Sequence, residues 1–242
     1  MLLVLAALLF WFLPARLAVP LLEKRLGGVQ LHDVHGLLWD GAADQVLSRG
    51  GQPLGRAQWQ LSRRAVLGQP QLALQFQGSQ LSGHGAVRQS GPQSVELDDQ
   101  QWHLDLALLN ATGAAWGAPR GLLDVQVPHA QTQGVWPLQL EAHAQWHDAH
   151  LLADEGDVAL GQLQLDLQGQ NGVIGGNLHD DGQGPLQVQA QLQLSPLGWR
   201  IVASLHPRQP SPTLSRWLLK FGQPDAAGDW HIERHGGLAT EK

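Results

Sequence analysis

The chain has 242 residues, of which 43% are apolar and only 15% charged, and its formal net charge is -6. This length suits one large β domain or two smaller ones. An acidic chain lacks the clustered Lys and Arg residues of a phosphate-binding surface, which argues against nucleic acid as a partner. Because there is no cysteine, a disulfide scaffold and any thiolate metal site are excluded.

The first 22 residues are almost entirely apolar. Met1 to Phe12 contains no charged residue, and Leu13 to Leu22 adds only Arg16. A membrane span needs about 20 apolar residues, so residues 1–22 are predicted to form a membrane anchor helix. Two alternatives stay open. One is a cleaved signal peptide, which a missing basic start and a poor cleavage site disfavour, and the other is a buried core helix.

Two tryptophan-bearing stretches follow the apolar segment. The first runs from His35 to Gly41 and contains Trp39, and the second runs from Leu54 to Leu61 and contains Trp59. A Gly-rich turn lies between them. We predict two strands that form the first hairpin, with both indole rings anchoring its core.

Beyond Val29, apolar and polar residues alternate with a period of two, which is typical of strands that bury one face. The apolar positions of the predicted strands are 72, 74 and 76; 102, 104, 106 and 108; 138, 140, 142, 144 and 146; 163, 165 and 167; 186, 188, 190, 192 and 194; and 199, 201, 203 and 205. Turn signals at intervals of roughly ten residues predict antiparallel meanders.

One segment has the helical period instead. Pro212 follows Ser211, and apolar residues recur at i, i+3, i+4 and i+7 from Leu214 to Phe221, directly before Gly222. We therefore predict an all-β fold: an antiparallel, curved and partly open multi-stranded sheet that resembles a groove. An N-terminal transmembrane helix (1–22) precedes this β-rich domain (23–242), which ends in one short C-terminal helix. A closed sandwich or barrel is the alternative.

Twelve histidines raise the question of a metal site, for which His143, His147 and His150 are the best candidates. His143 and His147 share a strand face but are about 13 Å apart along the strand, too far to bind one zinc ion together. We therefore predict that these histidines face solvent.

The remaining acidic and histidine groups lack the spacing of a known site. We interpret these groups as solvated turns or isolated side chains. They are His32 and Asp33 with His35; Asp98-Asp99; Asp154-Glu155 with Asp157; and Asp180-Asp181. Nucleophile-elbow, phosphate-loop, dinucleotide and zinc-protease motifs are missing from the sequence. We therefore predict no catalytic, cofactor-binding or metal-binding residues and expect that the protein is not an enzyme.

The chain resembles type II secretion system protein N, the general secretion pathway N family, in two groups of residues. The first is Gly36-x-Leu38-Trp39-Asp40-Gly41, with Leu54-Gly55, Trp59-x-Leu61 and Leu67-Gly68; the second is Leu218-Leu219-Lys220-Phe221-Gly222-Gln223-Pro224-Asp225, followed by Gly228. The motif residues to which we assign a structural role are Gly36, Trp39, Gly41, Gly55, Trp59, Gly222, Asp225 and Gly228.

The resemblance implies a single-span inner-membrane protein with a periplasmic body, acting as a structural adaptor of the type II secretion machinery. Its expected partners are the inner-membrane platform and the outer-membrane secretin. The family is also similar to AsmA-like β-groove proteins, which supports the open sheet. An alternative function is therefore lipid binding or lipid transfer through an apolar groove.

Overall fold

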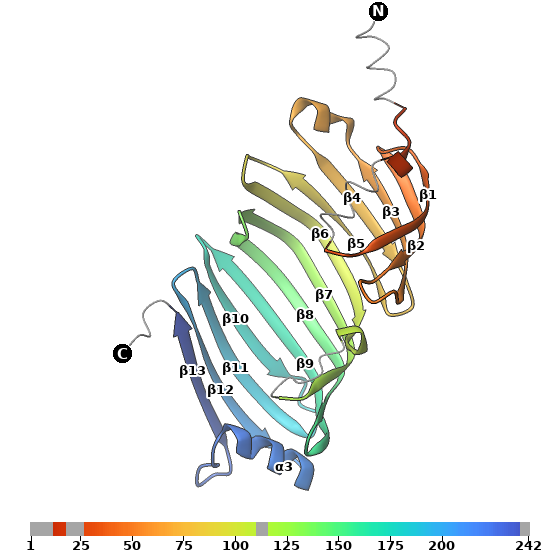
Figure 1. Ribbon diagram of the computed structural model, residues 1–242. Helices are drawn as coiled ribbons and strands as arrows, with labels where there is room; N and C mark the ends of the chain where they lie inside the picture. The colour runs from red at the N-terminus through yellow and green to blue at the C-terminus, as the bar shows by residue number, and fades with distance from the viewer. Residues whose placement is uncertain (1–11, 18–26, 110–115, 238–242) are drawn as a thin grey trace, which may run out of the picture. The chain divides into compact units, whose positions relative to one another are not determined.

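The computed structural model describes residues 12–17, 27–109 and 116–237 (Figure 1). Within these residues, thirteen strands form one antiparallel sheet, and their order in the sheet is their order along the chain. The sheet is therefore open, with β1 and β13 as its edge strands. The all-β, antiparallel and open parts of the prediction are confirmed, whereas the groove stays a prediction.

The strands alternate with short turns and few helices. Their bounds are β1 (Gln30–Gly36), β2 (Asp40–Leu47), β3 (Pro53–Leu61), β4 (Gln71–Gln77), β5 (Leu81–Gln89), β6 (Ser94–Asp105), β7 (Ala118–Gln133), β8 (Trp136–Ala153), β9 (Gly156–Gln170), β10 (Val173–Asp180), β11 (Leu186–Ser195), β12 (Gly198–Pro207) and β13 (Trp230–Gly237). The helical segments are η1 (Arg63–Leu67), η2 (Leu106–Leu109), α3 (Pro212–Leu218) and η3 (Leu219–Phe221).

The chain divides into two compact units, Met1–Gln100 and Gln101–Lys242. In the first unit, the predicted strand at 35–41 is wrong: β1 ends at Gly36 and β2 begins at Asp40. The backbones of Leu37 and Asp40 exchange two hydrogen bonds of 2.8 and 3.1 Å, which closes a tight turn. Trp39 therefore lies in this turn, whereas Trp59 lies in β3 as expected.

The predicted membrane helix falls mostly outside the described residues, which leave out 1–11 and 18–22. Among those described, the Leu13 carbonyl accepts a hydrogen bond of 2.8 Å from the Leu38 N–H, and Pro14 forms a β-bridge with Leu37. Within the described ranges, none of the helices has the length and apolar character needed to cross a membrane. The anchor and the domain boundary at residue 23 stay predictions.

In the second unit, cross-strand pairs place apolar side chains on one face. Examples are Ala142 opposite Leu167 and Val188 opposite Leu205. The helix α3 lies at one end of these strands (Figure 1), and its residues Leu214, Trp217 and Leu218 join the strands' side chains in one buried cluster. Ser211 caps the N-terminus of α3, because its Oγ accepts a hydrogen bond of 3.2 Å from the Leu214 N–H. The short C-terminal helix is therefore confirmed.

Leucines farther along the same face are only partly buried. They are Leu165, Leu167, Leu192 and Leu194, which continue the alternation from the buried residues Leu163 and Val188. Because full burial of an exposed leucine side chain is worth about 1.5–3 kcal/mol, covering the exposed part of these side chains would contribute only a fraction of that free energy each.

One predicted strand ends earlier than its period suggests. The alternation at 102–108 continues only to Asp105, the end of β6, and residues 106–109 form η2. The Asp105 Oδ1 accepts a hydrogen bond of 2.9 Å from the Ala107 N–H. Such a local side-chain contact favours a turn over an extended strand.

Candidate functional site

The first group of motif residues surrounds the turn before β2. Trp39 is buried, with only 4% of its surface exposed. Trp59 donates a hydrogen bond of 3.2 Å from its Nε1 to the Leu38 carbonyl, and it lies opposite Gly41 in the β2–β3 pairing. A Cβ on Gly41 would lie 2.5 Å from the Trp59 Cζ2, so the indole occupies the space that a larger residue would need.

Two further glycines permit close backbone approach in the same unit. Gly36 has a φ of +82° and ends β1, where an added Cβ would lie 2.6 Å from the Asp40 carbonyl oxygen. Gly55 has a φ of +146°, and a Cβ there would lie 2.3 Å from the Gln77 carbonyl oxygen. Both positions combine an unusual φ with a lack of space for a side chain.

The second group of motif residues builds the loop between η3 and β13. Asp225 organises it: its Oδ1 accepts hydrogen bonds of 2.8 and 2.9 Å from the N–H groups of Ala227 and Asp229. The N–H of Gly228 donates to the Asp225 carbonyl at 3.1 Å. At the start of the loop, the Gly222 carbonyl accepts a hydrogen bond of 3.1 Å from the Trp230 Nε1. These contacts direct the chain into the edge strand β13.

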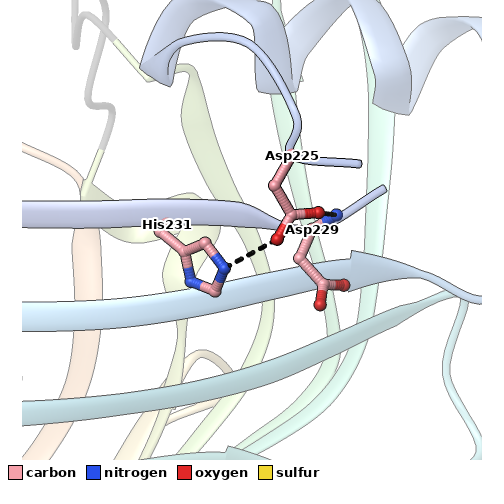
Figure 2. A group of neighbouring side chains, drawn as sticks. All are labelled: Asp225, Asp229 and His231. Atoms are coloured by element: carbon pink, nitrogen blue, oxygen red, sulfur yellow. Dashed lines mark hydrogen bonds and ion pairs between the residues drawn. The ribbon is translucent and has the colours of Figure 1, made fainter. Parts of the chain in front are cut away.

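This loop and the start of β13 together contain a group that sequence reasoning missed. Possible metal-ligand atoms of Asp225, Asp229 and His231 lie within 4.8 Å of one another (Figure 2). Three such ligands with an open position are typical of a catalytic zinc site. The His231 Nε2, however, already lies 3.1 Å from the Asp225 Oδ2, and the Asp229 Oδ1 lies 2.6 Å from the His206 Nδ1.

Internal contacts therefore account for the geometry of these three side chains. Hydrogen bonds from the Asp229 backbone N–H, then from His231 and Ala227, outweigh desolvation and hold the pKa of Asp225 below its ordinary value. The sequence signal for the group, Asp-x3-Asp-x-His, has no familiar metal-site spacing.

The three histidines considered as zinc ligands have separate partners. The Nδ1 of His143 lies 2.6 Å from the Asp166 Oδ1, the Nε2 of His147 lies 3.0 Å from the Asp124 Oδ2, and His150 contacts a backbone carbonyl. The structure does not bring these histidines together as one site. The hydrogen bond to Asp166 is the main reason why the pKa of His143 is raised above its ordinary value.

Asp124 contacts two imidazoles on the polar face of the sheet. Its Oδ1 lies 2.5 Å from the His103 Nδ1, and its Oδ2 contacts His147. Desolvation raises the pKa of Asp124, but hydrogen bonds and charge from the two histidines together outweigh it and lower that pKa. This arrangement links the three neighbouring strands β6, β7 and β8 through side-chain contacts.

The paired carboxylates of the sequence also have structural partners. Asp180 accepts hydrogen bonds from Val188, Gly182 and Arg208, and Glu155 forms an ion pair of 2.8 Å with Lys220. Asp99 lies 3.5 Å from His84, and Asp98 lies 3.7 Å from Arg88. Asp98 and Asp99 thus contact different groups, and Asp180 and Glu155 each have a cationic partner.

Comparison with known proteins gives one consistent result. Residues 27–233 match the profile of the family described as "Type II secretion system (T2SS), protein N". The chain is 29% identical over 246 residues to a Vibrio cholerae protein called type II secretion system protein N, covering 93% of this chain and 91% of that protein. No solved structure gives a significant match. Because the family profile matches most of the sequence, the chain belongs to the type II secretion system protein N family.

Proposed function

We propose that the protein is a structural adaptor of the type II secretion machinery, anchored in the inner membrane by one span and extending its β-rich body into the periplasm. The observation that carries this proposal is the family match across residues 27–233. The expected partners are the inner-membrane platform and the outer-membrane secretin. This role requires no catalytic reaction and depends on surfaces that bind other proteins.

The edge strand β1 offers a physical mode of contact. An edge strand presents unpaired backbone N–H and C=O groups, to which an extended segment of another protein can add as a further strand. Most residues of β1 are exposed. A partner strand there would add main-chain hydrogen bonds on the side of β1 opposite β2.

A photo-crosslinking amino acid tests this mode. It is placed either at Gln30, exposed on the edge strand β1, or at Gln191, which is also exposed but lies on the interior strand β11. In cells with the complete secretion system, we expect the Gln30 variant to form an adduct with the secretin or a platform protein. The Gln191 variant should form none, because β11 is paired on both sides.

The outcome that contradicts the adaptor proposal is equally specific. If neither variant forms an adduct, and the affinity-tagged chain retains no secretin or platform protein from solubilised membranes, the proposed contacts are absent. Adducts at both positions in equal yield would exclude strand addition at β1 as the mode of contact.

A second candidate function is lipid binding, which the half-buried leucines of β9 and β11 favour. If the protein binds lipid, we expect its β-rich domain to resemble AsmA-like β-groove proteins. The half-buried apolar face would then contact acyl chains. Native mass spectrometry distinguishes the two functions. For this measurement, the chain is released from membranes in a detergent-free polymer and exchanged into lipid-free buffer. Stoichiometric retained phospholipid supports lipid binding, and its loss contradicts it.

A further inference from the structure

The edge strand β13 pairs only with β12 within the described residues. Its sequence from Trp230 to Gly237 contains no proline and has side chains of both charges. The side chains of His231 and Glu233 are 63% and 56% exposed. Charged groups usually discourage pairing at an edge, so their order along β13 determines which strand can pair with it.

The symmetry of a self-pair restricts its register. Two copies of β13 that pair antiparallel are related by a twofold axis perpendicular to the sheet. This axis keeps each side chain on the same face of the sheet in both copies. Since faces alternate along a strand, opposite residues are an even number apart, and every register is centred on a residue that faces its own copy.

Charge excludes the registers centred on His231, Glu233 and Arg234. A register centred on His231 places Asp229 opposite Glu233, and registers centred on Glu233 or Arg234 place each of these residues opposite itself. Like charges directly opposite one another destabilise a strand pair. A register centred on His235 also avoids these contacts but pairs Glu233 and Arg234 only with glycines, which leaves the register centred on Ile232.

That remaining register is complementary throughout. It places His231 opposite Glu233 twice, with Ile232 opposite Ile232 and Arg234 opposite the uncharged Trp230, and it brings the loop residue Asp229, directly before β13, toward His235. The His231 Nε2 already contacts the Asp225 Oδ2, so its Nδ1 is the atom that would meet Glu233 of the second copy. An imidazole can donate a hydrogen bond to a carboxylate or, when protonated, form an ion pair with it. Arg200 donates two hydrogen bonds, of 3.0 and 2.7 Å, to the Oε1 of Glu233, which leaves the Oε2 to accept one from a second copy.

We propose that β13 pairs with β13 of a second copy of this chain, antiparallel and centred on Ile232, so that two sheets join at this edge. The inference goes beyond the adaptor function and does not depend on it, because secretion partners are proposed to bind at β1. The two apolar faces would lie on the same side of the joined sheets.

The absence of natural cysteine permits a direct test with single cysteines in the full chain. In the proposed register, two copies of Ile232→Cys lie directly opposite, with Cα atoms about 4.5–5.5 Å apart, within the range of a disulfide. Two copies of Arg234→Cys lie about 13 Å apart along the strands and cannot form one. Arg234→Cys is therefore the matched control.

Membranes that contain each variant are treated with a mild oxidant and analysed without reducing agent. For Ile232→Cys we expect a disulfide-linked product of twice the 26.2 kDa chain mass. Its yield should be at least about tenfold above the dimer yield of Arg234→Cys, a factor equal to about 1.4 kcal/mol. Equal yields, a greater yield from Arg234→Cys, or no dimer in either variant would overturn the proposal. A disulfide from Ile232→Cys to a different protein in place of the dimer would also overturn it.

A charge change tests the complementarity itself. Glu233→Lys, added to Ile232→Cys, places a cation opposite His231 and should slow dimer formation about two- to thirtyfold, since each cross-strand pair is worth about 0.2–1 kcal/mol and two are lost. The control Gln191→Lys adds the same charge to the interior strand β11 and should leave the rate unchanged. An unchanged rate with Glu233→Lys would contradict the proposed register.

Discussion

Replacing Leu218 with alanine tests whether α3 holds its place on the sheet through buried apolar contact. Leu218 is 0% exposed, whereas its neighbour Leu219 is 49% exposed. Leu218→Ala removes three buried carbon atoms, worth about 0.8 kcal/mol each, and leaves a cavity. The expected loss of unfolding free energy is about 3–4 kcal/mol. Leu219→Ala should cost about 1 kcal/mol, because half of that side chain is already exposed.

Equilibrium urea unfolding of the full chain, followed by far-UV circular dichroism, measures both variants. With an m-value of about 2 kcal/mol/M, a difference of 2 kcal/mol between them separates their midpoints by about 1 M. If the two units unfold in separate transitions, only that of residues 101–242 should move. Equal midpoints for the two variants would refute the view that α3 is held by this buried cluster.

Three further predictions concern the hairpin, the polar face and the loop. Gly41→Ala should lower the unfolding free energy by about 1–3 kcal/mol in a urea titration, because its Cβ would collide with the Trp59 indole. Gly50→Ala should leave the unfolding free energy unchanged, because the nearest atom to its Cβ would be 3.8 Å away. NMR titration should find the pKa of His143 above its ordinary value of 6.5 and a return toward it in Asp166→Asn. This contact therefore stabilises the fold fully below about pH 6.5, and its contribution is lost as the pH rises through the higher folded-state pKa. Asp225→Ala should lower the melting temperature more than Asp225→Asn, which keeps an acceptor for the loop N–H groups; equal losses would assign the effect to charge alone.

Local signals were sufficient to predict much of the fold. The period of two between Leu72 and Phe76 predicted β4, and Ser211 with Pro212 predicted the start of α3. In both cases the residues that determine the structure are neighbours in sequence. The sequential order of the strands then follows because antiparallel neighbours joined by short turns pair most easily.

Features that depend on backbone irregularity were not predictable in this way. Trp146 and Ala149 both join the buried face, although they are an odd number of residues apart, because the strand is irregular between them and Asp148 has a φ of +47°. The group of Asp225, Asp229 and His231 depends on the loop that Asp225 itself organises. The sequence pattern does not predict such a turn, because the turn depends on hydrogen bonds that only the structure shows.

The sequential order of the strands also affects how the chain can fold. Each strand pairs with the strand that precedes it in the sequence, so a new strand finds its partner as soon as it is available. Pairing over short sequence separations has a low loop-closure entropy and favours fast folding. A chain of this kind can build its sheet progressively while its C-terminal part is still being synthesised, with β13 and its edge completed last.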